Sequence, residues 1–325
     1  MRAIIAKQPG GAEQLQVIDQ PKPDPKAGEL LVKVKAIGIN RTDIINREST
    51  SGYFDHPILG IEVAGVVEKA GSSTNIQTGK PVMGLVNGGG YAEYAVMPAD
   101  RAMPIPENLS FEQAVAIPEV FLTAYQTLFW LGNLKENETV LIHAGGSGVG
   151  TAAIQLAKQL AKANVITTAG TKEKLDYCRT LGADIGINYK NENFAEEVMK
   201  TTQNEGVDLI LDFIGASYWQ KNLRSIKVDG RWILIGTLGG SELEHVNLMD
   251  IMAKRIRLQG TLLTPRSDQY KAELTKEFSA KAWNLFKTGW LKPVLDKTFP
   301  FEQVQEAHKY MENNKNIGKI VLWVE

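Results

Sequence analysis

Short apolar or alternating runs, separated by turn residues, make up the first hundred residues of the chain. Runs of this kind between Pro- and Gly-rich segments are typical of β-strands. Residues 21–28 are predicted to form a loop that leads into one such strand, and residues 84–90 hold four glycines. The pattern therefore predicts an irregular, β-rich domain with strands near residues 2–6, 30–35, 64–69 and 91–97.

From about Phe111 the pattern changes. Amphipathic stretches of about 10 to 15 residues, such as 151–163 and 171–181, alternate with short runs of Val, Ile and Leu, which is the pattern of βαβ units on a parallel sheet. Six such runs separated by helices are typical of a doubly wound nucleotide-binding sheet. We expect its strands at residues 139–143, 164–168, 184–188, 207–213, 231–236 and 257–262.

After about Pro265 the pattern predicts a helix at residues 270–287 and a final strand at residues 319–324. That strand has no partner in the parallel sheet, so we expect it to return to an unpaired edge of the N-terminal β-rich domain. The expected organisation is a discontinuous β-rich catalytic domain, residues 1–118 and 266–325, with a Rossmann dinucleotide-binding domain, residues 119–265, between its two segments.

Length, composition and charge exclude several classes of protein. The 325 residues correspond to about two domains. Hydrophobic residues make up 43% and charged residues 22% of the chain, which argues against disorder, fibres and low-complexity chains. The formal net charge of −1 provides no overall field for nucleic acid or an anionic membrane.

The few cysteines and histidines fit a reducing compartment. Cys178 is the single cysteine and the four histidines are scattered, so we expect neither an intramolecular disulfide nor a structural metal cluster. The N-terminus lacks the apolar core of a signal peptide, and no stretch approaches the roughly 18 to 20 apolar residues that span a bilayer. We therefore expect a cytoplasmic protein.

A glycine-rich turn joins the first strand of the predicted parallel sheet to a helix. In Ala144-Gly-Gly-Ser-Gly-Val-Gly150 the backbone N–H groups and the helix N-terminus would bind a pyrophosphate. Ser147 stands at the middle glycine of G-x-G-x-x-G, so either the turn differs or the hydroxyl itself binds phosphate. The alternative is a tight turn that needs glycine only for its backbone. The predicted cofactor contacts here are Gly145, Gly146, Ser147, Gly148, Val149 and Gly150.

The end of the next strand bears on which dinucleotide is bound. A unit that binds NAD carries Asp or Glu there, whereas this chain has Thr168-Ala-Gly-Thr-Lys-Glu-Lys174. Two lysines in a first helical turn run against the helix dipole, which favours the 2′-phosphate of NADP nearby. The alternative is a solvated lysine pair, with Glu173 as a partial complement. The predicted contacts at this end are Gly170, Thr171, Lys174 and Tyr189.

Further motifs are distributed along the whole chain. Asp24-Pro-Lys-Ala-Gly-Glu-Leu-Leu-Val-Lys-Val34, Gly38-Ile-Asn-Arg-Thr-Asp43, Leu59-Gly-Ile-Glu-Val-Ala-Gly65, Leu122-Thr-Ala-Tyr125 and residues 143–150 resemble the medium-chain dehydrogenase/reductase superfamily. Tyr218-Trp219, Asp229-Gly-Arg-Trp232, Glu306-Ala-His-Lys-Tyr310 and Asn316-Ile-Gly-Lys-Ile320 resemble its zinc-independent quinone oxidoreductase branch, in particular the stress-inducible NADPH-dependent type. The resemblance implies a GroES-like fold for the β-rich catalytic domain.

The chain departs from the zinc alcohol dehydrogenases of that superfamily at the metal positions. Asn40 stands where the catalytic zinc needs Cys, Ile61 stands where it needs His, and the four clustered cysteines of a structural zinc lobe are absent from the sequence. Glu62 remains, but a lone carboxylate does not make a tetrahedral zinc site. We therefore expect no zinc, and an acceptor that is already electrophilic, such as a quinone or a conjugated enal or enone.

The resemblance also implies which residues surround the nicotinamide and the acceptor. Asn40 and Tyr53 are the candidate catalytic residues. Asn40 could instead be a buried amide that satisfies backbone groups. Tyr53 could instead anchor a loop or form a stacking wall, and Thr123 could be an interior or capping threonine. His143 and Cys178 are expected to be packed core residues. The implied cofactor contacts are Thr123, Gly236, Thr237, Leu238, Thr261, Leu262, Leu263 and Asn316.

Three functions are compatible with these features. The first is an NADPH-dependent quinone oxidoreductase, and the second is a reductase of α,β-unsaturated carbonyls, which must also deliver a proton to the α-carbon. The third is an NADPH-binding sensor or structural protein without turnover. The near-neutral charge and the lack of a basic stripe interleaved with aromatic residues argue against RNA binding. We expect a homodimer, because the open sheet leaves an edge at residues 257–262.

Overall fold

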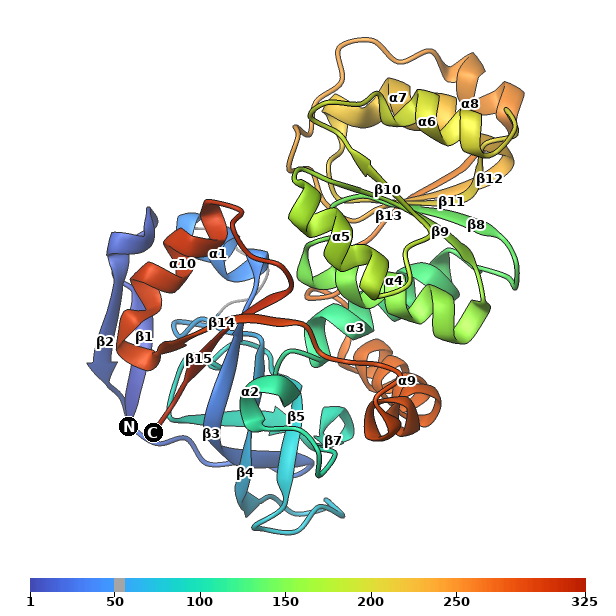
Figure 1. Ribbon diagram of the computed structural model, residues 1–325. Helices are drawn as coiled ribbons and strands as arrows, with labels where there is room; N and C mark the ends of the chain where they lie inside the picture. The colour runs from blue at the N-terminus through green and yellow to red at the C-terminus, as the bar shows by residue number, and fades with distance from the viewer. Residues whose placement is uncertain (50–55) are drawn as a thin grey trace. The chain divides into compact units, whose positions relative to one another are not determined.

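We describe the protein from a computed structural model, which defines residues 1–49 and 56–325. The chain divides into two compact units. Met1–Leu122 and Leu263–Glu325 form one, which we call the two-segment unit, and Thr123–Leu262 forms the other, the middle unit. Figure 1 labels their helices and strands, and each unit is described by itself.

The two-segment unit is built on β-sheets, as expected for its N-terminal part. The strands are β1 (Arg2–Ala6), β2 (Leu15–Asp19), β3 (Glu29–Ile39), β4 (Glu62–Ala70), β5 (Pro81–Leu85), β6 (Tyr94–Pro98), β7 (Met103–Pro104), β14 (Leu295–Pro300) and β15 (Lys319–Trp323). Its helices are α1 (Arg41–Glu48), α2 (Phe111–Ala114), α9 (Asp268–Thr288) and α10 (Val304–Glu312), with 3₁₀ turns at Ala12–Gln14, Ala99–Arg101 and Phe301–Gln303. Helix α3 (Pro118–Tyr125) runs from this unit into the middle unit.

The main sheet of the two-segment unit joins segments far apart in the sequence. Its strand order is β14-β15-β3-β4-β5-β7, and β6 also pairs with β3. Strand β15 lies antiparallel to β3, with Ile320 opposite Ile39, which confirms the expected return of the C-terminal strand. Side chains from both segments form one core, in which Leu30, Val63 and Leu322 are fully buried. Burial of apolar area is the main term that holds the two segments together.

The middle unit is the predicted doubly wound sheet. All six strands are parallel, in the order β10-β9-β8-β11-β12-β13. Figure 1 shows α4 and α5 on one face of this sheet and α6, α7 and α8 on the other. The strands are β8 (Thr139–Ile142), β9 (Asn164–Ala169), β10 (Ile185–Asn188), β11 (Val207–Asp212), β12 (Ile226–Leu234) and β13 (Arg257–Gly260). The helices are α4 (Gly148–Ala161), α5 (Lys172–Thr180), α6 (Phe194–Thr201), α7 (Trp219–Ser225) and α8 (Leu248–Lys254), with a π-helical segment at Gln126–Leu131 and a 3₁₀ turn at Ala216–Tyr218.

Two boundaries in the middle unit differ from the prediction. Helix α4 begins at Gly148, inside the glycine-rich turn, because the Ser147 side chain caps it by accepting a hydrogen bond from the Gly150 N–H. Strand β12 begins at Ile226 rather than 231. Its first half mixes polar and apolar residues, with Val228 and Asp229 exposed and Asp229 in a left-handed conformation with φ 63°, so no apolar run marks it in the sequence.

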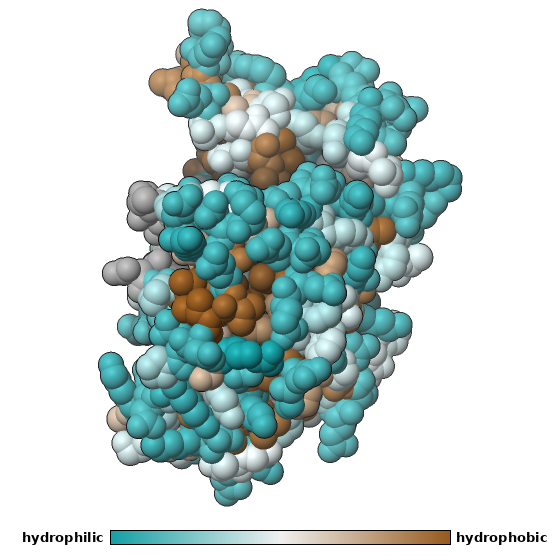
Figure 2. All heavy atoms as spheres, turned by 90° about the vertical axis from the view of Figure 1, so that its left-hand side faces the viewer, coloured by the Kyte–Doolittle hydropathy of each residue, from teal (hydrophilic) through white to brown (hydrophobic). Residues whose placement is uncertain are grey.

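One helical segment corrects the expectation about membrane-spanning stretches. Among the described residues, Phe111–Leu131 has the length and mean hydropathy of a membrane-spanning helix. Of its most apolar window, 83% is buried inside the protein, so packing in the core accounts for the apolar composition. The face shown in Figure 2 is mostly hydrophilic, with apolar residues exposed in small groups.

Candidate active site

The glycine-rich turn after β8 is shaped by contacts that only glycine permits. A Cβ atom on Gly150 would lie 2.3 Å from the Ala144 carbonyl oxygen, and a Cβ on Gly145 would lie 2.0 Å from Thr167 Oγ1. Ser147 has φ −74°, an ordinary conformation, which explains why the middle position tolerates serine. Its hydroxyl accepts from the Gly150 N–H at 3.0 Å. Gly148 and Val149 lie in the first turn of α4, where backbone N–H groups have no intrahelical acceptor.

At the predicted adenosine end, Lys174 lies against Gly146 of the glycine-rich turn and Tyr189 lies against Gly170. A Cβ on Gly146 would lie 3.0 Å from Lys174 Cδ, and a Cβ on Gly170 would lie 2.8 Å from the Tyr189 hydroxyl oxygen. Lys174 and Tyr189 therefore pack directly against the two glycines. Thr171 caps α5 by accepting from the Lys174 N–H at 3.3 Å.

Lys172 is different from Lys174. Its ammonium group pairs with Asp176 one helical turn further on, and its side chain is 86% exposed. For Lys172 the alternative of a solvated surface lysine holds. The two lysines of the predicted anion-binding turn therefore form a matched pair for experiment, one against the glycines and one facing water.

The other predicted contacts of the middle unit lie mostly at the carboxyl ends of its strands. Gly236, Thr237 and Leu238 follow β12, and Thr261 and Leu262 follow β13. In a parallel sheet these ends share one edge with the glycine-rich turn that follows β8, which is where open α/β sheets bind ligands. Thr123 lies apart from them in sequence, buried in α3, and its carbonyl oxygen accepts from the Thr127 hydroxyl at 2.8 Å.

His143 and Cys178 are core residues, as expected. His143 is fully buried between Thr168 Oγ1, at 3.0 Å, and Asn222 Oδ1, at 2.7 Å. Burial lowers the pKa of its imidazole, so the ring is neutral and structural. Cys178 is also fully buried, and burial raises the pKa of its thiol to about 11, which makes it unreactive.

In the two-segment unit, Asn40 belongs to a buried cluster of charged and polar groups. The Lys319 ammonium donates to Glu62 Oε1 at 2.5 Å and to Asn40 Oδ1 at 2.7 Å. The Asn40 Nδ2 donates to the same Glu62 oxygen at 2.8 Å. The second Glu62 oxygen accepts from the Glu119 N–H at 2.8 Å. The three side chains of Asn40, Glu62 and Lys319 are thus buried and paired, since none of these residues is more than 7% exposed.

Three adjacent strands position this cluster. Asn40 directly follows β3 as the N-cap of α1, Glu62 begins β4 and Lys319 begins β15, and both β4 and β15 pair with β3. The Asn40 amide accepts through Oδ1 from Lys319 and donates through Nδ2 to Glu62. This arrangement is typical of a residue that positions its neighbours. Sequence reasoning missed Lys319, because a lysine at the start of an apolar strand has the usual pattern of a surface residue.

Two other predicted residues of this unit are Tyr53 and Asn316. Tyr53 lies outside the described residues. Asn316 donates from Nδ2 to the Gly318 carbonyl oxygen at 2.7 Å, within the turn that precedes β15. That contact is local, and the backbone of Gly318 has φ 85°, so Asn316 supports the tight turn whether or not it touches a cofactor.

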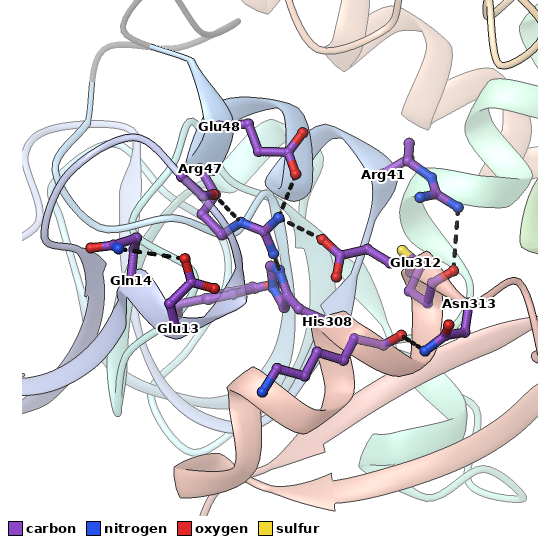
Figure 3. Close-up of polar contacts among 12 residues, drawn as sticks. Glu13, Gln14, Arg41, Arg47, Glu48, His308, Glu312 and Asn313 are labelled. Atoms are coloured by element: carbon purple, nitrogen blue, oxygen red, sulfur yellow. Dashed lines mark hydrogen bonds and ion pairs between the residues drawn. The ribbon is translucent and has the colours of Figure 1, made fainter.

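A second buried chain of hydrogen bonds begins next to Asn40. Asp43 Oδ2 accepts from the Asn40 N–H at 2.8 Å and from the Tyr91 hydroxyl at 3.2 Å. The Tyr91 hydroxyl oxygen lies 2.9 Å from His308 Nε2. Arg47 Nη1 lies 3.2 Å from His308 Nδ1, and since arginine only donates, Nδ1 accepts and Nε2–H points to Tyr91. Figure 3 shows the buried Arg47 guanidinium, which also binds Glu48 and Glu312.

Asp43 and His308, which both belong to this series of hydrogen bonds, have pKa values shifted in opposite directions. Burial raises the pKa of Asp43 to about 7, so its contribution to stability is present below about pH 4 and is lost as the pH rises through 7. Burial and the positive charge of Arg47 lower the pKa of His308 to about 3, so its contribution is present above about pH 6.5 and is lost as the pH falls toward 3.

Asp43→Asn is expected to become more stable relative to the wild type as the pH rises from about 4 to about 7, by up to about 4 kcal/mol. The variant no longer carries a buried carboxylate that must ionise. The measurement is the urea unfolding free energy of both proteins at several pH values. Asp24→Asn is the control. Its stability relative to the wild type should change with pH in the opposite direction, because Lys69 lowers the pKa of the exposed Asp24 carboxyl. A difference for Asp43→Asn that does not change with pH would contradict this account.

A cavity of about 250 Å³ lies in the two-segment unit beside the Glu62 cluster. Two of the residues that line it contact or adjoin Glu62. Ile61 precedes Glu62 in the sequence, and the Glu119 N–H donates to the Glu62 carboxylate. Leu263, a predicted cofactor contact, lines the same cavity. The full lining is Ile61, Leu85, Val86, Asn87, Gly88, Glu119, Leu263, Thr264, Pro265, Arg266 and Lys271.

Comparison with known proteins decides the family. The alcohol dehydrogenase GroES-like domain model matches residues 26–107, and the zinc-binding dehydrogenase model matches residues 148–280. Human quinone oxidoreductase is 32% identical, over 99% of this chain and 97% of that protein. The chain belongs to the quinone oxidoreductase type of medium-chain dehydrogenases/reductases. The resemblance drawn from the sequence motifs is therefore confirmed, and the protein is an oxidoreductase.

One further relative and one solved structure extend this comparison. Human synaptic vesicle membrane protein VAT-1 homolog-like is 32% identical, over 100% of this chain and 81% of that protein. The crystal structure of Escherichia coli quinone oxidoreductase complexed with NADPH has a TM-score of 0.91 and 30% identity, covering 100% of both chains. The latter match confirms the expected fold class, a GroES-like domain with a six-stranded parallel sheet.

Proposed function

We propose that the protein is an NADPH-dependent quinone oxidoreductase that acts without zinc. The observation that carries this proposal is the buried cluster of Asn40, Glu62 and Lys319, in which Asn40 stands where the zinc dehydrogenases of this superfamily need a Cys ligand. A lysine ammonium 2.5 Å from the Glu62 carboxylate already neutralises it, and a second cation beside it would be repelled. Among the described residues, the lining of the nearby cavity supplies no thiolate or imidazole, the ligands that catalytic zinc prefers.

The middle unit fits a phosphorylated dinucleotide. The glycine-rich turn and the N-terminus of α4 would hold the pyrophosphate, and Ser147 would keep the first turn in place as its cap. Lys174 and Tyr189, packed against Gly146 and Gly170, would hold the 2′-phosphate. NADPH supplies the reducing equivalents when bound, and the E. coli relative is a complex with NADPH. Gly236 to Leu238 and Thr261 to Leu263 remain the proposed contacts of the nicotinamide.

The residues of the two-segment unit favour an acceptor that is already electrophilic. The Asn40, Glu62 and Lys319 cluster offers no Lewis acid to polarise a plain ketone. Ile61, Val86 and Leu263 give the cavity an apolar wall suited to a planar ring. Catalysis would therefore depend on holding the acceptor and excluding water. Asn40 was predicted to be catalytic, but because its amide is paired with Lys319 and Glu62 we now propose it as a positioning residue, and we keep Tyr53 as the proposed hydrogen-bond donor to the reduced acceptor.

Lys174→Ala is expected to raise the KM for NADPH by about 10- to 100-fold while leaving the KM for NADH within about twofold. A hydrogen bond between a lysine and a phosphate contributes about 1.5–3 kcal/mol, and NADH has no 2′-phosphate to lose. The measurement is steady-state kinetics with each cofactor. Lys172→Ala, in the same helical turn but paired with Asp176, is the control and should change neither value. An equal loss for both cofactors in Lys174→Ala would reject the assignment of the 2′-phosphate site.

We also propose that the protein is a homodimer formed through the middle unit. Strand β13 is the last strand of its sheet, so one side of its backbone is free to pair with a second copy. Large apolar side chains are exposed in β13 and in the chain segments before and after it, with Leu248 and Met252 of α8 each 66% exposed. The others are Leu238, Leu243, Val246, Met249, Leu258 and Leu262. An exposed apolar surface of this extent is typical of an interface.

Replacing both Leu248 and Met252 with Asp is expected to convert the dimer into a monomer with unchanged secondary structure. Two buried, unpaired carboxylates at an interface would cost more than the interface contributes. The measurement is light scattering coupled to size exclusion. Trp290→Asp, at an exposed apolar residue of the two-segment unit, is the control that should leave the mass unchanged. A wild-type protein that elutes as a monomer would remove this proposal.

The cytoplasmic location remains a proposal that rests on the composition of the chain. Its one cysteine, Cys178, is buried and free, which fits a reducing compartment. One relative carries the name of a synaptic vesicle membrane protein, so a membrane-attached fraction is the competing outcome. Fractionation of the producing cells with an antibody to the protein distinguishes the two.

A further inference from the structure

The cavity of the two-segment unit has two chemically different sides. Ile61, Leu85, Val86, Leu263 and Pro265 supply apolar side chains, whereas Asn87, Arg266, Lys271 and Glu119 supply polar or charged ones. At about 250 Å³ the cavity is smaller than the roughly 300–1,000 Å³ of sites for drug-sized ligands. It therefore suits an acceptor of one or two rings with a polar substituent at one end.

Lys271 is the central polar residue of this cavity. It is only 6% exposed, and its ammonium donates to Asn87 Oδ1 at 2.9 Å and to the Thr264 carbonyl oxygen at 3.3 Å. Both acceptors are neutral. The nearest carboxylate oxygen among its recorded ion pairs, Asp268 Oδ1, lies 3.8 Å away, beyond hydrogen-bond distance. A buried ammonium that is held mainly by neutral acceptors is unfavourable unless an anion approaches it.

A second buried cation intensifies the positive charge behind Lys271. Arg101, only 1% exposed, donates from Nη1 to Asn87 Oδ1 at 2.7 Å, the same oxygen that accepts from Lys271. Arg101 also pairs with Asp268 at 2.7 Å and with Asp100 at 3.8 Å. Both carboxylates are more than half exposed and neither lines the cavity, so water screens their charge. Burial lowers the pKa of Lys271, and the positive charge of Arg101 lowers it further, whereas Asp268 and Glu119 act in the opposite direction.

The charges on the cavity wall are unbalanced in favour of cations. Lys271 and Arg266 are lining cations and Glu119 is the lining carboxylate. The Arg266 guanidinium carbon lies 4.7 Å from the centre of the Tyr270 ring, which holds this cation over an aromatic face. A neutral acceptor would use only the apolar side of the cavity and would make no contact between opposite charges with Lys271.

We propose that the physiological acceptor carries an anionic oxygen group, a carboxylate, which Lys271 binds while the ring system packs against Ile61, Val86 and Leu263. This inference rests on the proposed function, because it identifies the cavity with the acceptor site. It makes Lys271 a binding residue that selects acceptors by charge. The class of substrate is then a small quinone with a carboxylate side chain.

The first test compares two acceptors that differ only in charge. They are 3-(1,4-naphthoquinon-2-yl)propanoate and its methyl ester, assayed with NADPH and the full-length protein. The wild type is expected to favour the acid over the ester by about tenfold in kcat/KM, which equals about 1.4 kcal/mol. In Lys271→Met the preference should disappear, in Lys271→Arg it should return in part, and in Lys276→Met, at an exposed lysine of the same helix α9, it should stay at the wild-type value. An equal preference in the wild type and in Lys271→Met would overturn the inference.

The second test separates this inference from the proposed function. Binding of 2-naphthoate and of 2-naphthamide, which are not reduced, is measured by calorimetry on the NADPH-saturated protein. Tighter binding of the naphthoate that is lost in Lys271→Met but kept in Lys271→Arg supports the anion site, even if no quinone is turned over, in which case the proposed function alone fails. Turnover of neutral quinones together with equal binding of the two naphthalene probes would leave the proposed function in place and overturn the anion site.

Discussion

Lys319→Met is expected to lower the free energy of unfolding by about 3–5 kcal/mol, the largest stability effect predicted for a single side chain here. The substitution removes the ammonium that lies 2.5 Å from Glu62 Oε1 and 2.7 Å from Asn40 Oδ1. Glu62 is fully buried, so its carboxylate would be left without a countercharge, and breaking one partner of a buried pair has a cost of that size. Urea unfolding followed by circular dichroism measures it.

The double variant Glu62→Gln/Lys319→Met separates the charge effect from the loss of packing. It removes both charges while keeping similar volumes, and replacing both members of a buried pair is often close to neutral. We therefore expect it to regain most of the stability lost in the single variant. Lys309→Met, at an exposed lysine on α10, is the matched control. A loss below about 1 kcal/mol for Lys319→Met would show that the pair is not the buried anchor described here.

Gly150→Ala is expected to weaken NADPH binding by about a hundredfold. A Cβ at this position would lie 2.3 Å from the Ala144 carbonyl oxygen and 2.8 Å from Gly145 Cα. Both are backbone atoms, so the first turn of α4 must move away from the strand end. A displacement of about 1 Å in a positioning element has effects of this size, because the N–H groups that hold the pyrophosphate move with it.

Fluorescence titration with NADPH tests this prediction, with circular dichroism to show that the variant is folded. The control is Gly260→Ala at the end of β13, where nothing lies within 4 Å of the added Cβ. That variant should bind NADPH as the wild type does. Binding within about threefold of the wild type for Gly150→Ala would mean that the turn after β8 does not hold the cofactor.

The parallel sheet could be predicted from the sequence because its signals are local. Strands such as Val207–Asp212 are buried along their whole length, so they stand out as apolar runs, and the glycine-rich turn follows the first of the six directly. Strand β12 shows the limit of that reasoning. Its early half has no apolar run, and it is a strand because it pairs with Val207 and its neighbours across the sheet.

The buried polar clusters could not be predicted, because they depend on contacts between distant segments. Lys319 is 257 residues from its partner Glu62, and His308 is 217 residues from Tyr91. Lys271 has the helical spacing of a surface lysine in α9, yet it is buried against Asn87, which lies 184 residues away. Asn40 was identified through its place in a family motif, and the structure then supplied its partners.

The measurement that tests the central claim most directly is NADPH oxidation by the purified protein with an ortho-quinone, a para-quinone and a 2-alkenal as parallel acceptors, repeated with NADH. The account predicts quinone-dependent turnover that favours NADPH and is unaffected by a zinc chelator. Turnover of the alkenal alone would make the protein a reductase of unsaturated carbonyls instead. Tight binding of NADPH with no oxidation by any of the three acceptors would contradict the account and leave a binding protein without turnover.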